Sequence, residues 1–392
     1  MDFALTDDQQ AIRDMARGFA ADNLAPHSRE WDEKAHFPKD VYREAAALGL
    51  ATIYASEEHG GSGLGRMEAA LVFEALSEGD VSTAAYLSIH NMVAWMIDSF
   101  GSDETRAEYL PQLATMELFS SYCLTEPGSG SDAASLKTSA KVSGNADYVL
   151  NGGKAFISGG GVSDLYLVMA RTSADGPKGV SAFLVPKDAP GLSFGGQEKK
   201  MGWASQPTSQ VIFDDCKVPA RNRLGEEGQG FTFAMKGLDG GRVNIAACSL
   251  GGASMATKAA ARYAAERKQF GQPLSDFQAT QFKLADMATD LAASRLMVYR
   301  AAAALDAGEP RTRELCAMAK RFATDACWRV VDEALQLHGG YGYIRDYGME
   351  QSLRDLRVHR ILEGTNEIMR TIIARRVLKD VEEATLDVGL AA

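Results

Sequence analysis

The chain has 392 residues, of which 46% are hydrophobic and 24% charged, a balance typical of a folded enzyme of two or three domains. A formal net charge of −11 argues against nucleic acid as a partner, because phosphate binding requires a basic surface. The five cysteines form no C-x-x-C pair and the six histidines show no ligand spacing. We therefore expect reduced thiols, no disulfide framework and no metal site.

The start of the chain carries no targeting pattern. Residues 1–5 lack the basic and apolar segments of a signal peptide and are not Arg-rich like a transit sequence. No apolar run is long enough to span a membrane. These features predict a cytoplasmic, bacterial-type protein without membrane insertion.

Residues 1–120 predict a helical domain. Thr6 and Gln9 match a capping box, in which each residue's side chain bonds the other's main chain, and apolar residues then recur at helical spacing. Further helical patterns cover residues 68–76 and 86–100.

Residues 121–225 change to short runs rich in β-formers, such as 148–150 and 155–157. Turn signals at 143–145 and 151–153 are expected to separate the strands. Many short strands with such turns indicate a small sandwich or barrel. No long helical pattern lies between the runs, which argues against parallel βαβ units.

Residues 226–392 are again helical and rich in alanine. A breaker at 306–310 separates two apolar stripes, which predicts a bundle of long antiparallel helices. The first stripe begins at Leu284, and the second comprises Leu315, Met318, Ala319, Phe322 and Ala326. The fold class predicted for the whole chain is therefore multi-domain α+β.

Residues 122–132 (YCLTEPGSGSD) form a turn dense in glycine and hydroxyls after a predicted strand. Such a loop presents main-chain N–H groups to a planar polar ligand or a phosphate, although alone it is equally compatible with a plain hairpin. Gly128 and Gly130 imitate a nicotinamide-binding fingerprint. The residues that follow, 135–145, are turn-like and not a crossover helix, so we reject that interpretation.

Residues 336–343 (QLHGGYGY) end a predicted helix abruptly. The adjacent Gly339 and Gly340 permit positive φ and close backbone approach. Taken alone, the segment indicates a helix C-cap, and His338 indicates a structural histidine.

Glu363 follows two apolar residues and precedes a glycine, and Thr365 is a good N-cap for a helix. A carboxylate in apolar surroundings has a raised pKa, which suits a general base. The N–H groups at the helix start are also able to bind flavin or phosphate oxygens. The alternative is a surface glutamate favoured by the helix dipole.

In this order and spacing the three segments resemble the acyl-CoA dehydrogenase family, with one departure: Gln351 stands where a basic residue is usual. The resemblance covers essentially the whole chain. Within the family the chain most resembles the isobutyryl-CoA dehydrogenase branch of valine breakdown. The runs that carry this are 154–159 (KAFISG), 202–208 (GWASQPT) and 237–246 (GLDGGRVNIA).

The resemblance implies an N-terminal helical domain (1–120), a central β-barrel-like domain (121–225) and a C-terminal four-helix bundle (226–392). It implies FAD as the cofactor, a homotetramer, and oxidation of a short branched acyl-CoA, isobutyryl-CoA, to the 2-enoyl-CoA. The reduced flavin would then pass its electrons to an electron-transfer flavoprotein.

Residue roles follow from the resemblance by position. Glu363 would be the base, because Gly241, where some relatives carry the base, has no side chain. Substrate contacts are implied for Ser131, Asp239, Gly240, Gly241, Arg242 and Arg375. FAD contacts are implied for Tyr122, Cys123, Leu124, Thr125, Gly130, Ser131, Phe156, Ile157, Ser158, Thr365, Asn366 and Glu367. Contacts with the FAD of a neighbouring subunit are implied for Arg267, Phe277, Gln278, Gln336, Leu337, His338, Gly339 and Gly340.

Alternatives remain at this point. The alternative substrate is that of a short-chain or 2-methylbutyryl-CoA dehydrogenase. An acyl-CoA oxidase would pass electrons directly to oxygen, although such oxidases are usually longer. A non-enzymatic flavin- or CoA-binding protein would not need the intact base. Residues 84–92 are expected to supply part of the pocket floor, although their side-chain directions are not readable from the sequence.

Overall fold

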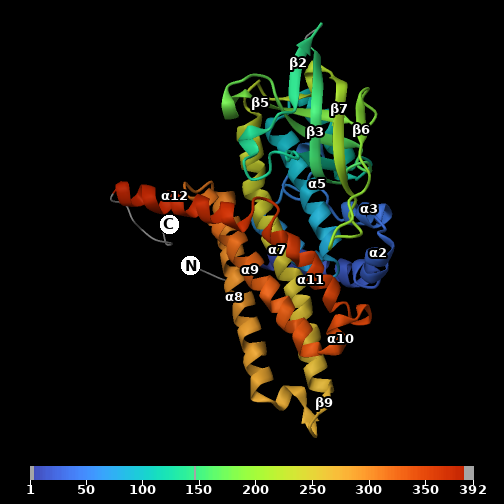
Figure 1. The fold of residues 1–392 in the computed structure, drawn as a ribbon, viewed down its shortest axis with the longest axis vertical. Helices are drawn as coiled ribbons and strands as arrows, with labels where there is room; N and C mark the ends of the chain where they lie inside the picture. The colour runs from blue at the N-terminus through green and yellow to red at the C-terminus, as the bar shows by residue number, and fades with distance from the viewer. Residues whose placement is uncertain (1–3, 145–146, 384–392) are drawn as a thin grey trace.

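The computed structural model describes residues 4–144 and 147–383. The β domain lies at one end of the long axis; α7 runs from it toward the opposite tip, and α8 and α9 lie beside the lower part of α7 (Figure 1). Residues 1–3 and Asn145 of the expected turn at 143–145 lie outside the described residues.

The N-terminal domain begins at the predicted capping box. The Thr6 side chain accepts a hydrogen bond from the Gln9 N–H, and the Gln9 side chain accepts one from the Thr6 N–H, which confirms the predicted helix start. α5 is apolar on nearly every side, because it lies between the β domain and α7. The helices are α1 (Asp7–Phe19), α2 (Ser28–Lys34), α3 (Lys39–Ala47), α4 (Arg66–Ser77), α5 (Val81–Phe100) and α6 (Asp103–Ala114).

The described part of the central domain folds as one eight-stranded sheet. Its strand order is β6-β7-β3-β2-β4-β5-β8, with β1 parallel to β4, and most other pairs are antiparallel. Alternate side chains point into a buried core. The strands are β1 (Ser120–Cys123), β2 (Ser139–Ser143), β3 (Asp147–Ser158), β4 (Leu165–Arg171), β5 (Val180–Pro186), β6 (Leu192–Phe194), β7 (Thr208–Val218) and β8 (Arg223–Leu224).

The turn predicted at 151–153 is wrong, because β3 runs through it without interruption. A register shift between Leu150 and Gly152 marks a β-bulge, and Gly152 has φ +142°. A Cβ at Gly152 would stand 2.7 Å from the Thr138 Cα. The glycine therefore lets the strand pass close to a neighbouring backbone instead of reversing it.

The C-terminal domain is built around α7, a helix of 37 residues. Its glycines allow close packing: a Cβ at Gly252 would meet a Leu356 methyl at 2.7 Å, and one at Gly251 would overlap the Glu74 carbonyl. In the described ranges, none of the helices is both long and apolar enough to cross a membrane. The elements are α7 (Gly230–Glu266), β9 (Lys268–Gln269), β10 (Gln272–Pro273), α8 (Gln278–Ala307), α9 (Thr312–His338), α10 (Gly340–Tyr343), α11 (Met349–Arg357) and α12 (Asn366–Glu382).

The second predicted apolar stripe is displaced around α9. Leu315, Met318 and Phe322 of that stripe are only half-buried. Ala319 and Ala326 of the stripe are fully buried, and so are further small side chains and one lysine of α9. These further residues are Cys316, Lys320, Ala323 and Cys327. Small buried residues allow close helix packing, and Lys320 reaches the segment before α12, where it donates to the Gly364 carbonyl.

Candidate active site

Glu363 lies in a tight turn between α11 and α12. It adopts φ +56°, a left-handed conformation that is uncommon for a residue with a side chain, and Gly364 follows at φ +88°. Thr365 caps α12 by accepting a hydrogen bond from the Ile368 N–H at 3.3 Å, which confirms the predicted helix start. The turn directs the Glu363 side chain back onto α7.

The Glu363 carboxylate fills the space that a side chain at Gly241 would occupy. A Cβ at Gly241 would stand 2.5 Å from Oε2 and 3.0 Å from Oε1 of Glu363. Oε2 is buried and has no hydrogen-bond partner among the described residues. Such an oxygen is available to accept a proton, and the absent side chain at Gly241 makes its position possible.

The surroundings of Glu363 favour its protonated form. Burial raises the pKa of Glu363 to about 7, although the charges of Arg242 and Lys320 oppose the shift. A pKa near neutrality suits a general base. The Tyr122 hydroxyl is also buried and without a partner in the described structure, and burial together with the Glu363 charge raises its pKa well above the usual range.

Two buried basic side chains hold the main chain of this turn, and burial lowers the pKa of one of them, Lys320, to about 7. Arg242 on α7 donates from Nε to the Glu363 carbonyl at 3.2 Å and forms an ion pair with Asp239. Lys320 on α9 donates from Nζ to the Gly364 carbonyl at 2.8 Å. Arg242 and Asp239 were expected from the sequence, whereas Lys320 was missed. Its sequence signal is a lysine in the middle of an apolar helical face.

Asn366 ties the start of α12 to α9. Its Oδ1 accepts from Lys320 Nζ at 2.9 Å, and its Nδ2 donates to Thr324 and to Asp325 at 3.0 Å each. The side chain is buried, while Glu367 beside it is exposed. Of the three residues 365–367, Glu367 therefore presents the freest side chain for the expected FAD contact.

Gly240 packs against another buried cation. A Cβ at Gly240 would overlap the Arg66 guanidinium, which lies over the Tyr54 ring at 3.6 Å and the Trp95 ring at 4.7 Å from their centroids. Arg66 was not anticipated from the sequence. The glycine pair of α7 thus accommodates Arg66 on one side and the Glu363 carboxylate on the other.

A buried ion pair shapes the expected flavin loop. Lys154 Nζ donates to Glu126 Oε1 at 2.8 Å and to the Leu124 carbonyl at 3.0 Å. Glu126 also accepts from the main-chain N–H groups of residues 137 and 138. The Ala155 N–H donates to the Thr125 carbonyl at 2.9 Å. These bonds hold the loop beside the next residue of β3, Phe156.

Phe156 is 68% exposed and has φ +58°, an unusual combination for a large aromatic residue. The exposed ring follows Ala155, whose N–H bonds the Thr125 carbonyl, and it is the side chain of residues 156–158 that is freest for the expected FAD contact. Gly130 and Ser131 of the same loop are exposed. Ser158 is half-buried, and its carbonyl accepts from Ser121 Oγ at 2.6 Å.

The side chains of Cys123, Leu124 and Ile157 point into the core, so their expected contacts with FAD would involve main-chain atoms. Burial raises the pKa of the Cys123 thiol far above its usual value, which keeps that thiol protonated.

The remaining expected FAD residues lie at the far tip of the bundle, near β9 (Figure 1). Arg267, at the C-terminal end of α7, is roughly 39 Å from Gly241 at 1.5 Å per residue. There His338 stacks on Tyr263 at 4.5 Å, and Arg267 lies over the Tyr341 ring at 5.6 Å. The same end of the bundle carries Phe277, Gln278 and Gln336–Gly340, so a single subunit does not bring these residues to Glu363.

Arg375, which is expected to contact the substrate, lies exposed on α12.

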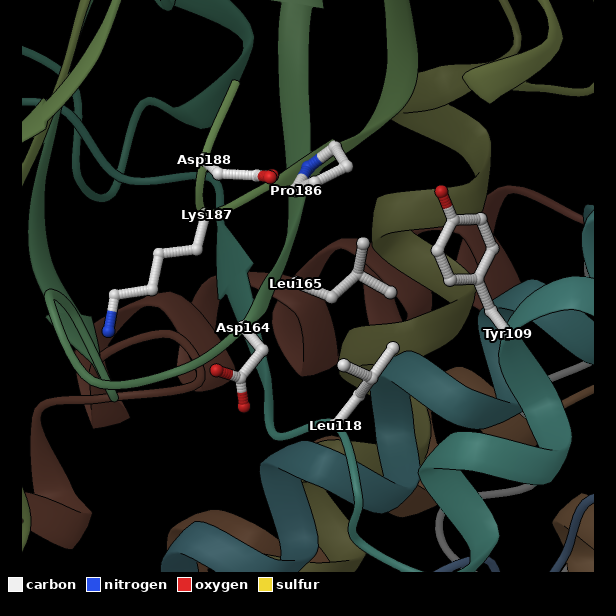
Figure 2. Close-up of a pocket in the computed structure, with 7 residues that line it drawn as sticks. All are labelled: Tyr109, Leu118, Asp164, Leu165, Pro186, Lys187 and Asp188. Atoms are coloured by element: carbon white, nitrogen blue, oxygen red, sulfur yellow. The ribbon is translucent and has the colours of Figure 1, made fainter. Parts of the chain in front are cut away.

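A surface pocket of about 500 Å³ lies apart from Glu363, between α6 and the β domain. Figure 2 shows the side chains around it, and none belongs to the cluster around Glu363. Its lining residues are Tyr109, Leu118, Asp164, Leu165, Pro186, Lys187 and Asp188. The described residues contain no group of three or more metal-ligating side chains, and the five cysteines, all described, are buried and unbridged.

The three domains match three family models: the N-terminal domain of acyl-CoA dehydrogenases over residues 6–117, the middle domain over 121–216 and the C-terminal domain over 228–378. Isobutyryl-CoA dehydrogenase, mitochondrial, of Dictyostelium discoideum is 57% identical over 96% of this chain and 90% of its own length. The match to the isobutyryl branch expected from the sequence is thereby confirmed.

Two solved structures share the fold. Butyryl-CoA dehydrogenase from Megasphaera elsdenii superimposes with a TM-score of 0.94 at 39% identity, covering 96% of this chain and all of that chain. PigA with FAD and proline superimposes with a TM-score of 0.93 at 32% identity, covering 96% and 99%. The chain therefore belongs to the acyl-CoA dehydrogenase family and is an FAD-dependent oxidoreductase.

Proposed function

We propose that this enzyme dehydrogenates isobutyryl-CoA to the 2-enoyl-CoA, with Glu363 as the base, as a step of valine breakdown. The observation that carries the role of Glu363 is its buried Oε2, which lies against Gly241 without a hydrogen-bond partner among the described residues. The similarity to the Dictyostelium discoideum protein supports the short branched substrate.

The α-hydrogen of an acyl thioester is a weak acid, so its removal requires a positioned base and stabilisation of the enolate. Glu363 takes this proton on its carboxylate, and its own N–H donates to the thioester oxygen. FAD, held by the loop around Thr125 and by Phe156, would supply the acceptor for the β-hydrogen, which leaves with its electron pair as hydride. Arg242 and Lys320 fix the main chain on either side of the base, and burial excludes water from the carboxylate.

The expected FAD- and substrate-binding residues remain proposals, with Thr125 and Phe156 beside the flavin ring and Ser131, Asp239, Arg242 and Arg375 toward acyl-CoA. We also propose a homotetramer, a cytoplasmic location and an electron-transfer flavoprotein as the acceptor. The acceptor is tested by comparing turnover with that flavoprotein and with oxygen. Hydrogen peroxide formed in step with product would indicate an oxidase instead.

The substrate is tested by a kcat/KM panel of isobutyryl-, 2-methylbutyryl-, butyryl-, isovaleryl- and octanoyl-CoA. One methylene in an apolar pocket changes specificity by about 10–200-fold. The kcat/KM for isobutyryl-CoA should therefore be at least about tenfold higher than that for octanoyl-CoA. A maximum at 2-methylbutyryl-CoA would assign the chain to that neighbouring specificity. A maximum at octanoyl-CoA would overturn the short-chain assignment and leave the family unchanged.

A further inference from the structure

Trp203 reaches from the β domain to the face of α7 on which Gly241 lies, against the Glu363 carboxylate. Ile245 lies one helical turn beyond Gly241 on that face, roughly 6 Å along the axis. Ile245, Trp203 and Ala85 of α5 form one buried cluster. Leu362, the residue before the base, packs against the same cluster. The indole is therefore a near neighbour of the base along α7.

The backbone of Trp203 is fixed in an unfavourable conformation. It has φ +53°, in the left-handed region, and its N–H donates to Asp355 Oδ1 at 2.5 Å. The preceding Gly202 approaches the Arg354 carbonyl so closely that a Cβ would overlap it. Strain of this kind persists only where the surroundings enforce it, and it recurs at functional positions.

The space behind the indole is filled. His359 lies edge-on to Trp203 with ring centroids 5.4 Å apart, and its Nδ1 is 2.7 Å from Ser249 Oγ, two turns beyond Gly241 on α7. Burial lowers the pKa of His359 to about 3, so the ring is neutral. Ser205 Oγ donates to Ser82 Oγ at 2.8 Å, which ties the Trp203 segment to α5. Residues of α5, of α7 and of the segment after α11 thus surround the indole.

We propose that the Trp203 indole forms the end wall of the acyl pocket and sets its limit on chain length. This rests on the proposed function, in which the acyl α-carbon lies at Glu363. The two methyl groups of an isobutyryl chain stay near the α-carbon. A linear chain of medium length that continued along α7 from Gly241 toward Ile245 would meet the indole.

The test compares Trp203→Leu, which removes the rings, with Trp203→Phe, which keeps an aromatic wall. For each FAD-loaded enzyme, kcat/KM is measured with isobutyryl-, hexanoyl- and octanoyl-CoA. Trp203→Leu should raise the octanoyl-to-isobutyryl ratio at least about tenfold, the lower bound for a change of one methylene in such a pocket. Trp203→Phe should leave the ratio near that of the wild type.

A ratio unchanged in Trp203→Leu would overturn the proposal. A purely structural role would lower activity toward all three substrates together and leave the ratio constant, which also counts against it. If Trp203→Leu does not fold, Trp203→Met fills more of the space with a flexible side chain and should shift the ratio in the same direction. Failure of the proposed function is distinct, because it appears in the wild type as a preference for octanoyl-CoA.

Discussion

At Glu363, different parts of the fold control the main chain and the carboxylate. Arg242 and Lys320 bond the carbonyls of residues 363 and 364, and Thr365 caps the next helix, so the left-handed turn is held on three sides. The carboxylate is positioned by the free space above Gly241. The proposed base is therefore held in place, and no described residue forms a hydrogen bond with its buried Oε2.

The pH dependence of kcat/KM should follow the ionisation of Glu363. Its pKa is raised by burial to about 7, and only the ionised carboxylate accepts the α-proton. Activity should therefore rise with pH through a midpoint near 7 and level off above it. A profile measured with isobutyryl-CoA that stays flat from about pH 5.5 to 8.5 would contradict this assignment.

Gly241→Ala should displace the base without removing it. The added Cβ would stand 2.5 Å from Glu363 Oε2, so the carboxylate must move. A misplacement of about 1 Å can cost roughly 10²-fold in rate, and we expect a kcat loss of that order with FAD content retained. Gly18→Ala, where a Cβ meets nothing within 4 Å, is the control. Equal activity in the two variants would show that the site tolerates the methyl group.

At the scale of helices and strands, the features that depend on residues close together in the sequence are predictable from it. The caps at Thr6 and Thr365 were expected from local patterns and are present. The residues around Gly152 predict a turn, whereas the structure has a bulge there. The glycine is required by the backbone of Thr138, which is distant in sequence, so the local pattern does not reveal the bulge. Trp203 was read only as part of a family motif, because nothing nearby in the sequence reveals its contact with Ile245.

Lys320 shows the same limit at the active site. Its bonds go to residues more than forty positions away, so a lysine among apolar residues gave no indication of its partners. The sequence does single out Glu363 as a candidate base, because two apolar residues precede it and a glycine and a helix N-cap residue follow it. The sequence thus indicates Glu363 as the candidate base, whereas it does not indicate the residue on α9 that holds the Glu363 turn.

Lys320→Met should weaken the coupling between α9 and the Glu363 turn. The variant loses the bonds to Gly364 and Asn366 and removes a cation that lowers the pKa of Glu363. We expect kcat to fall about tenfold or more and the acid limb of kcat/KM to move to higher pH, with FAD retained. Lys320→Arg keeps the charge and should restore the position of that limb. An unshifted limb in Lys320→Met would contradict the coupling.

At the scale of the whole molecule, α7 connects the region around Glu363 with the far tip of the helical bundle. Its N-terminal half carries Gly241 and Arg242 beside the base, and its C-terminal end carries Arg267 at the tip (Figure 1). Large apolar side chains are exposed at that tip, with Phe270 94% and Tyr343 81% exposed. Such surface is typical of an interface between subunits and fits the proposed homotetramer.

Arg267→Ala tests whether the tip serves the cofactor of a neighbouring subunit. The variant should lose much of its bound FAD, because the guanidinium is expected to contact the FAD of a neighbouring subunit, while the fold around Glu363 stays intact. FAD content and molar mass by light scattering are the measurements. Arg262→Ala, an exposed arginine on the same helix, is the control. Full FAD occupancy in a monomeric Arg267→Ala would rule out the shared site.

The most direct test of the role of Glu363 is flavin reduction by isobutyryl-CoA without oxygen, in the wild type and in Glu363→Gln. The amide keeps the shape of the side chain but does not accept the proton. The flavin of Glu363→Gln should bleach at least about 10²–10⁴-fold more slowly, while FAD content and acyl-CoA binding persist. Bleaching at close to the wild-type rate would show that another group removes the α-proton.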